Sequence, residues 1–228
     1  MKKIIIKGAG SYDQFQFQDC EDLKPSENEV LIAVRSIGVN FADVCIRLGV
    51  YESAKKYVGW PITPGFEVSG KVQAIGAKVT KYSIGQEVVG FTLFNGYATQ
   101  VSIKEEHVLP LPKGFTLEEG GAFPAVFFTA YHALHQQVVL QPNSKILIHS
   151  AAGGVGTALV QLCKAENHFT VGVIGSSQIT QCIEGMEKLI QAGKIKPIPI
   201  TQIPFQDVAE AHRLIESGQS VGKLTLIV

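Results

Sequence analysis

The chain has 228 residues, and its 20 Lys and Arg residues balance 20 Asp and Glu residues, so the formal net charge at pH 7 is zero. This balance argues against a dedicated nucleic-acid-binding protein, which needs a basic excess to bind the phosphate backbone. Hydrophobic residues make up 46% and charged residues 18% of the chain, a composition typical of a folded globular protein rather than a disordered one.

The first third of the chain is predicted to form short strands separated by turn residues. The segment Phe15-Gln16-Phe17-Gln18 alternates apolar and polar side chains, which is the pattern of a half-buried strand. Further strands are predicted over residues 2–7, 30–39, 67–76, 86–91 and 97–102. Short strands at this close spacing favour a compact barrel or sandwich.

The middle of the chain changes to alternating helix and strand. The alanine- and aromatic-rich stretch 117–140 predicts a helix through Thr129–Leu134. Residues 145–150 and 169–174 are apolar runs that predict two buried parallel strands. Between them, five small or apolar residues share one face of a predicted helix: Val155, Ala158, Leu159, Leu162 and Cys163. Together these segments predict one β-α-β unit.

The C-terminal part is predicted to contain a helix over residues 183–192 and a strand-like segment over 196–200. Asp207 and Glu210 have the spacing of an N-cap and N3 pair, which predicts the start of a further helix. The chain ends in a predicted strand over residues 223–228.

The cysteine pattern and the N-terminal segment indicate the cellular compartment. Cys20, Cys45, Cys163 and Cys182 form no CxxC pair, so the sequence contains neither a zinc knuckle nor a thioredoxin motif. We interpret them as reduced, mostly buried thiols of a cytoplasmic protein. The apolar run Ile4–Ile6 is too short for a signal peptide, and no apolar stretch reaches the roughly 18 residues that a membrane span needs.

The most informative motif follows the first buried strand and fits A-x-G-x-x-G, a variant of the dinucleotide-binding fingerprint. It consists of Ala151, Ala152, Gly153, Gly154, Val155 and Gly156. The N–H groups of Gly153, Gly154 and Val155 would approach a pyrophosphate at the positive end of the following helix, and Gly156 would let this helix pack closely on the sheet. A strand before, a helix after and a second strand provide the context that the fingerprint requires. A purely structural turn is the alternative.

The residues after the second buried strand favour NADP(H) over NAD(H). An NAD site usually has an acidic residue there, which accepts a hydrogen bond from the ribose 2′-hydroxyl. This sequence has Gly175, Ser176 and Ser177 instead, which leave room for a 2′-phosphate and can donate to it. No Lys or Arg lies between Lys164 and Lys188, so a basic partner for that phosphate is not visible locally.

The order of several motifs resembles the zinc-independent medium-chain dehydrogenases/reductases, specifically the quinone oxidoreductase branch with its vesicle amine transport protein-like members. The motifs are Gly38–Asp43 with Arg47, Gly49 and Tyr51; Pro64–Gly70; Gly85–Val88; Phe128–Tyr131; Ser150–Gly156; and Glu210–His212 with Gly222 and Lys223. The resemblance implies an α/β plus β fold. A GroES-like barrel over residues 1–124 and 195–228 would contain an inserted, truncated Rossmann domain over residues 125–194.

The resemblance also implies roles for individual residues. Asn40, Asp43 and Tyr51 match positions that line the cleft beside the nicotinamide, and Thr129 matches a cofactor contact. The alternatives are local: Asn40 and Asp43 could cap a helix, Tyr51 could serve packing, and Thr129 could be a helix-terminal hydroxyl. Zinc-bearing relatives have Cys and His where this chain has Asn40 and Phe66, which argues against a zinc site.

The histidines offer no metal site from sequence. His132 and His135 are expected to be partly exposed residues of one helix without further ligands. His149 is expected to be a hydrogen-bonded core histidine in a strand.

A complete Rossmann domain has two β-α-β-α-β halves, and only the first β-α-β is visible here. The missing elements correspond to roughly 80–100 residues. The expected junction lies near residues 177–181, and an engineered deletion, a natural truncation and an omitted stretch all remain open. The implied function is NADPH-dependent, zinc-free reduction of a quinone or an enone, by a family whose complete fold is a homodimer. A non-catalytic scaffold with half a cofactor site is the alternative.

Overall fold

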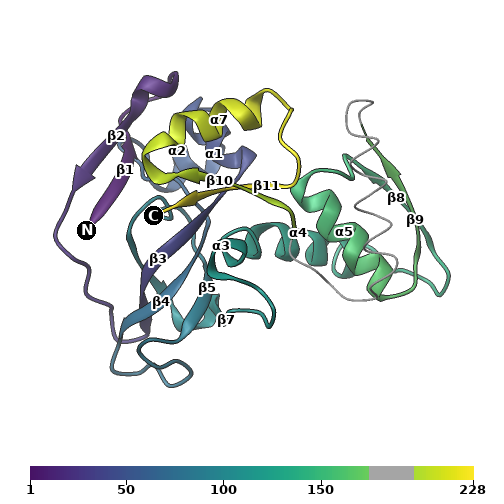
Figure 1. Ribbon diagram of the computed structural model, residues 1–228, viewed down its shortest axis with the longest axis horizontal. Helices are drawn as coiled ribbons and strands as arrows, with labels where there is room; N and C mark the ends of the chain where they lie inside the picture. Colours follow the sequence, from purple (N-terminus) through teal and green to yellow (C-terminus); the bar gives the residue numbers. More distant parts are fainter. Residues whose placement is uncertain (175–197) are drawn as a thin grey trace. The chain divides into compact units, whose positions relative to one another are not determined.

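The computed structural model describes residues 1–174 and 198–228. The chain divides into two compact units (Figure 1). Unit 1 comprises residues 1–124, 202–219 and 224–228, and unit 2 comprises residues 125–201 and 220–223. Among the described residues, no helix has the length and apolar character needed to cross a membrane.

The main sheet has seven strands, ordered β10-β11-β3-β4-β5-β7, with β6 also paired to β3. The strands are β3 (Glu29–Val39), β4 (Glu67–Ile75), β5 (Glu87–Phe91), β6 (Gln100–Lys104), β7 (Val108–Pro110), β10 (Ile200–Pro204) and β11 (Lys223–Ile227). The long strand β3 pairs with β6 along its first half and with β11 along its second half. This pairing brings the C-terminal strand into the sheet of the N-terminal part.

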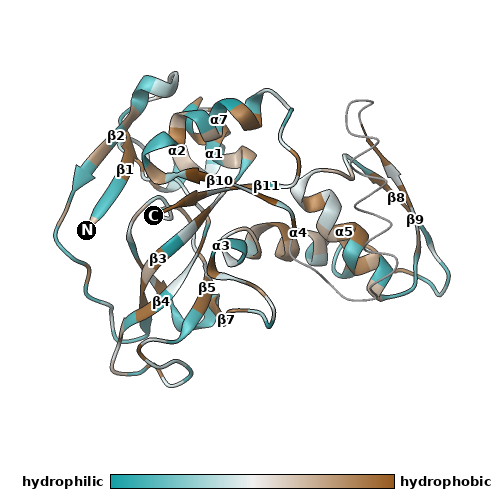
Figure 2. Cartoon of the chain, in the orientation of Figure 1, coloured by the Kyte–Doolittle hydropathy of each residue, from teal (hydrophilic) through white to brown (hydrophobic). Residues whose placement is uncertain are grey.

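Smaller elements complete unit 1. They are the hairpin β1 (Lys2–Ile6) and β2 (Phe15–Asp19), with helices α1 (Phe41–Arg47), α2 (Glu52–Tyr57), α3 (Leu117–Gly120) and α7 (Val208–Glu216). Short 3-10 turns occupy residues 12–14, 105–107 and 205–207. The core is formed by aliphatic side chains of the strands together with Tyr97 and the buried face of α7. Figure 2 shows β11 as a largely hydrophobic strand next to β3, and β10 pairs with the other edge of β11.

Unit 2 contains helix α4 (Pro124–His135), strand β8 (Lys145–His149), helix α5 (Gly154–Ala165) and strand β9 (Phe169–Val173). The strands β8 and β9 are parallel, so α5 is the crossover of the predicted β-α-β unit. One buried cluster of this unit consists of Leu134, Ile148, Ala151 and Cys163. The predicted β-α-β arrangement is therefore confirmed.

The predicted burial of these two strands is wrong for the described residues. In β8 only Ile148 is buried, and β9 has no buried residue; Leu147 and Phe169 are 59% and 61% exposed. Parallel strands become buried when further strands flank them and helices cover both faces. Among residues 1–174 and 198–228, only β8 and β9 belong to this sheet. For the same reason His149, expected in the core, is exposed, and Val155 on α5 is exposed as well.

Other predictions differ in position. The strand expected over residues 97–102 begins at Gln100, because Tyr97 and Ala98 pair with β1 instead. The strand expected over residues 196–200 is found at Ile200–Pro204. Of the free cysteines described, Cys163 is buried while Cys20 and Cys45 are half-buried. The predicted helix over residues 183–192, the junction near 177–181 and Cys182 lie outside the described residues.

Candidate cofactor turn and acceptor site

The glycine-rich turn connects the end of β8 to the start of α5. Ser150 adopts a positive φ of 54°, and its carbonyl accepts a hydrogen bond from the Gly153 N–H at 2.9 Å. The Ala151 N–H donates to the Val173 carbonyl at 3.0 Å, which attaches the turn to β9. Gly153 is the N-cap residue of α5, and its carbonyl accepts from the Thr157 N–H at 2.8 Å. The turn is thus fixed on both sides by backbone hydrogen bonds.

Two glycines of the turn are required by close contacts. A Cβ atom on Gly156 would lie 2.6 Å from the Ala151 Cα and would also overlap the Ser150 carbonyl oxygen. A Cβ on Gly154 would lie 2.9 Å from the Val126 Cγ1 on α4. Real Cβ atoms essentially never approach other heavy atoms below 3.0 Å. Gly156 therefore allows α5 to begin directly against the strand end, as the fingerprint predicts.

The start of α5 has the electrostatic character of an anion site. The first N–H groups of a helix have no acceptor within the helix, and the helix dipole places partial positive charge there. The first turn of α5 contains no acidic residue to neutralise this charge. Gly153, Gly154 and Val155 are partly or fully accessible, whereas Ala152 and Gly156 are buried. Because the Gly153 N–H already donates to the Ser150 carbonyl, it is not the phosphate donor that the sequence predicts. The backbone at Gly154 and Val155 could bind a phosphate or pyrophosphate group.

The remaining predicted cofactor residues fall in two places. Thr129 is an exposed residue of α4, and Val126, one helical turn earlier, contacts the glycine turn. Gly175, Ser176 and Ser177 lie outside the described residues. Of the predicted cofactor residues, the described part of unit 2 therefore contains the glycine turn and Thr129.

In unit 1, Asn40 and Asp43 meet at the start of α1. Asn40 is the N-cap of this helix, and Oδ2 of Asp43 accepts the Asn40 backbone N–H at 2.8 Å, as the acid of a capping box does. The other carboxylate oxygen, Oδ1, accepts the Gly65 N–H at 2.9 Å. The Asn40 side-chain Nδ2 donates to Glu67 Oε1 at 3.0 Å. Asp43 and Glu67 are fully buried, while Asn40 is partly exposed.

Tyr51 belongs to a neighbouring aromatic cluster. Its ring lies 5.8 Å from the Phe66 ring and 6.4 Å from the Phe94 ring, and the latter two rings are 5.5 Å apart. Ile6 and Ile62 pack behind this cluster. Because Phe66 precedes Glu67, the aromatic cluster and the Asn40–Glu67 pair are joined through adjacent residues of the chain.

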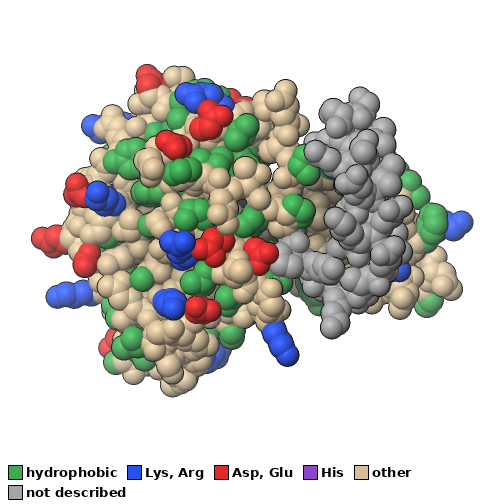
Figure 3. All heavy atoms as spheres, viewed as in Figure 1, with side chains coloured by type: hydrophobic (Ala, Val, Ile, Leu, Met, Phe, Trp, Pro, Cys, Tyr) green, Lys and Arg blue, Asp and Glu red, His purple; other side chains and the backbone are tan. Residues whose placement is uncertain are grey.

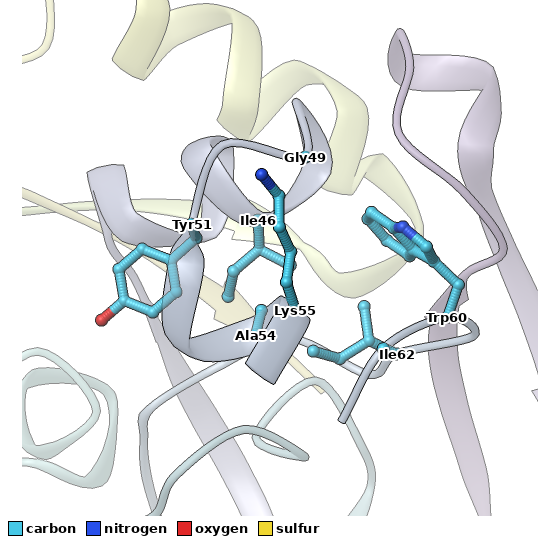
Figure 4. Close-up of a pocket in the computed structure, with 8 residues that line it drawn as sticks. Ile46, Gly49, Tyr51, Ala54, Lys55, Trp60 and Ile62 are labelled. Atoms are coloured by element: carbon cyan, nitrogen blue, oxygen red, sulfur yellow. The ribbon is translucent and has the colours of Figure 1, made fainter. Parts of the chain in front are cut away.

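A small pocket opens beside this cluster between α1, α2 and the segment after α2. It is lined by Ile46, Gly49, Tyr51, Ala54, Lys55, Gly59, Trp60 and Ile62. Figure 4 shows the Tyr51 ring on one side and the Trp60 indole on the other, with the Tyr51 hydroxyl pointing away from Trp60. The Lys55 ammonium is paired with Glu52 at 2.9 Å. The pocket wall is therefore mainly apolar.

Sequence reasoning did not single out Glu67, Tyr97 or His212 as parts of the site. Glu67 and His212 stood inside motifs of the family resemblance, so their presence was visible but their partners were not. Tyr97 is fully buried, and its hydroxyl lies 3.2 Å from Nε2 of His212. Among the described residues, no group of three or more His, Cys, Asp or Glu side chains is arranged to hold a metal ion.

Two family comparisons cover most of the chain. Residues 26–142 match the alcohol dehydrogenase GroES-like domain, and residues 113–226 match the zinc-binding dehydrogenase family. The Danio rerio synaptic vesicle membrane protein VAT-1 homolog is 36% identical over 222 residues, which cover 96% of this chain and 43% of that protein. The chain thus spans less than half the length of this relative.

Solved structures with the same fold include enzymes. The Escherichia coli quinone oxidoreductase complexed with NADPH matches with a TM-score of 0.81 at 19% identity, covering 100% of both chains. The CurF ER cyclopropanase from the curacin A biosynthetic pathway matches with a TM-score of 0.89 at 20% identity, covering 99% of this chain and 98% of the other. The expected α/β plus β fold with a GroES-like domain is therefore confirmed.

Proposed function

Because the chain belongs to the medium-chain dehydrogenase/reductase family, in its quinone-oxidoreductase-like branch, we propose that it is an NADP(H)-dependent oxidoreductase. Its substrate would be a quinone or an α,β-unsaturated carbonyl compound, reduced without zinc. The observation that carries this proposal is the glycine turn, in which Gly156 permits α5 to start against the end of β8.

The residues of the turn fit the diphosphate of a nicotinamide cofactor. A side chain at Gly153 would sit 3.3 Å from the Ser150 carbonyl oxygen, a contact tighter than nine in ten real Cβ contacts. The first turn of α5 carries no competing acid. When bound, the cofactor supplies a hydride. The chain's own contribution is to bind the diphosphate at Gly153–Gly156 and to orient the acceptor.

On the acceptor side we propose different roles for the three predicted residues. Asp43 has both carboxylate oxygens bonded to backbone N–H groups, so it acts as a positioning residue rather than by touching the substrate. Asn40 is partly exposed, and its amide is oriented by Glu67, so it can contact the acceptor. Tyr51 contributes to the aromatic wall and has a hydroxyl that could supply the proton; solvent is the other source.

Zinc-free chemistry is supported by the residue at a ligand position of zinc-bearing relatives. Phe66 stands there, and its ring packs against Tyr51 and Phe94. A phenyl ring has no atom that can ligate Zn²⁺. The aromatic surface suits the planar, largely apolar ring of a quinone or the conjugated system of an enone.

The scaffold alternative is favoured by a specific observation: the described part of unit 2 has one β-α-β unit, whereas a complete Rossmann domain has two β-α-β-α-β halves. Thermal unfolding with added nucleotide distinguishes the NADP(H)-dependent oxidoreductase from the non-catalytic scaffold. Saturating NADPH at 100 times its Kd would stabilise the native state by about 2.7 kcal/mol and raise the Tm, with a smaller rise for NADH. The Gly156→Ala variant should lose this rise, while Gly8→Ala, which meets nothing within 4 Å, should keep it.

If NADPH leaves the Tm of the wild-type chain unchanged, the proposal of an NADP(H)-dependent enzyme is wrong, and the result supports a non-catalytic scaffold. Where NADPH does bind, its oxidation in the presence of a simple quinone and of an enone identifies the acceptor class.

A further inference from the structure

A buried polar chain lies behind Asn40 in unit 1 and involves two residues to which no role has been assigned. Tyr97 and His212 are both fully buried, and the Tyr97 hydroxyl lies 3.2 Å from Nε2 of His212. Burial raises the pKa of Tyr97 well above 10.0, and the charge of the nearby Asp43 carboxylate and its hydrogen bond with the Tyr97 hydroxyl raise it further. Tyr97 therefore connects His212 to Asp43.

The direction of the hydrogen bonds follows from the charges. Burial and the nearby Arg47 guanidinium lower the pKa of His212 to about 3, so its ring is neutral. An ionised carboxylate only accepts hydrogen bonds, so the Tyr97 O–H donates to Asp43. The Tyr97 oxygen is then free to accept, and Nε2–H of His212 donates to it. In this tautomer Nδ1 of His212 carries no hydrogen. Because Nδ1 has no hydrogen-bond partner, the tautomer avoids a buried N–H group without an acceptor.

The Asp43 carboxylate at the end of this chain holds two backbone segments of the acceptor site. It accepts the N–H of Asn40 and the N–H of Gly65. Gly65 has a φ of 99°, and a Cβ there would lie 2.6 Å from Cδ1 of Tyr97. The same carboxylate thus fixes the start of α1 and the segment that carries Phe66 and Glu67.

We propose that Tyr97 and His212 are positioning residues of the acceptor site, which hold the Asp43 carboxylate in the orientation that fixes Asn40 and the Gly65–Glu67 segment. The inference rests on the proposed function, because it takes Asn40 and the Phe66 wall as parts of the acceptor site. His212 lies on α7, so the C-terminal helix takes part in building a site whose other residues come from the first half of the chain.

Amide hydrogen exchange tests this proposal without requiring activity. Tyr97→Phe removes the hydroxyl alone and should speed exchange of the Asn40 and Gly65 amides about tenfold or more. Tyr82→Phe is the matched control, because Tyr82 is a buried tyrosine of the same unit whose hydroxyl donates to the Val108 carbonyl. It should leave these two amides unchanged. His212→Leu should resemble Tyr97→Phe, and His212→Gln, which retains a side-chain N–H donor, should restore part of the protection.

If Tyr97→Phe and His212→Leu leave the Asn40 and Gly65 amides as protected as Tyr82→Phe does, the proposal is overturned. In ¹⁵N spectra, His212 should show a protonated Nε2 and a bare Nδ1; the opposite tautomer would also contradict it. Where the wild-type chain reduces an acceptor, Tyr97→Phe should lower kcat with little change in KM for NADPH. A wild-type chain without activity would refute the proposed function, while the exchange result would still decide the positioning role.

Discussion

The side-chain amide of Asn40 donates a 3.0 Å hydrogen bond to Oε1 of Glu67, which joins the N-cap of α1 to the first residue of β4. Glu67 is a fully buried acid, and burial of a carboxylate is costly unless hydrogen bonds compensate for the lost water. The hydrogen bond of Asn40 therefore both orients the Asn40 amide and compensates in part for the burial of Glu67 in the sheet.

On the face of the molecule shown in Figure 3, acidic and basic side chains are exposed and interspersed, in contrast to the buried Glu67.

Gly38 should tolerate no side chain, because a Cβ there would overlap both the Glu67 carboxylate and the Gly121 carbonyl oxygen. We expect Gly38→Ala to lower the free energy of unfolding by about 3 kcal/mol, since neither the backbone nor the Asn40–Glu67 pair can move away cheaply. Gly8→Ala, in open space, should change it by less than about 0.5 kcal/mol. Denaturant unfolding of both variants measures the difference, and equal stabilities would contradict the close contact.

Glu216 on α7 is paired with the buried guanidinium of Arg47 on α1. Glu216→Ala would leave this buried charge without its carboxylate, and we expect a loss of about 2 kcal/mol, reduced from the cost at a fully buried pair because Glu216 is partly exposed. Glu210 on the same helix pairs with the exposed Arg213, so Glu210→Ala should cost less than about 0.5 kcal/mol. Comparable losses in chemical denaturation would show that Arg47 does not depend on Glu216.

His212 should make the protein less stable in mild acid. Its pKa is lowered from 6.5 to about 3 by burial and by Arg47, so the unfolded chain binds a proton below pH 6.5 that the folded chain does not bind until about pH 3. The stability contribution is complete above pH 6.5 and falls by about 1.4 kcal/mol per pH unit below it, or about 2 kcal/mol at pH 5. The titratable groups near the His212 ring are the Arg47 guanidinium, which lowers its pKa, and the Tyr97 hydroxyl, which lies 3.2 Å from Nε2.

Denaturant unfolding of the wild type and of His212→Gln between pH 7 and pH 5 isolates this contribution. The variant should be less stable at pH 7 but should lose less stability on acidification. Parallel curves for the two proteins would mean that His212 is not held neutral.

Tyr51→Phe tests the proton source of the proposed reaction. If the Tyr51 hydroxyl is the proton donor, its removal should lower kcat about 100-fold, with unchanged NADPH affinity. Tyr57→Phe, at an exposed tyrosine of α2, should leave turnover unchanged. A Tyr51→Phe variant that retains full activity would assign the proton to solvent. The measurement is NADPH oxidation with saturating quinone or enone.

Local features of this protein were predictable from its sequence because they depend on neighbouring residues. The turn at Ala151–Gly156 between a strand and a helix follows from small residues beside an apolar run. The structure confirms this turn. Helix capping by Asn40 and Asp43, which the sequence left as an alternative to a role in the site, is also found. The alternation in Phe15–Gln18 likewise predicted β2, but the predicted half-burial is wrong, because Phe17 is 51% exposed.

Burial and long-range pairing were decided only by the tertiary structure. The apolar runs of β8 and β9 read as buried strands, yet they are largely exposed among the described residues, because burial depends on which strands and helices cover a sheet and not on its own sequence. The contact between Tyr97 and His212 joins residues 115 positions apart in the sequence, and residues 125–201 of unit 2 lie between them in the chain. No local pattern encodes such a contact, since it arises when the C-terminal helix and strand return to the sheet around β3.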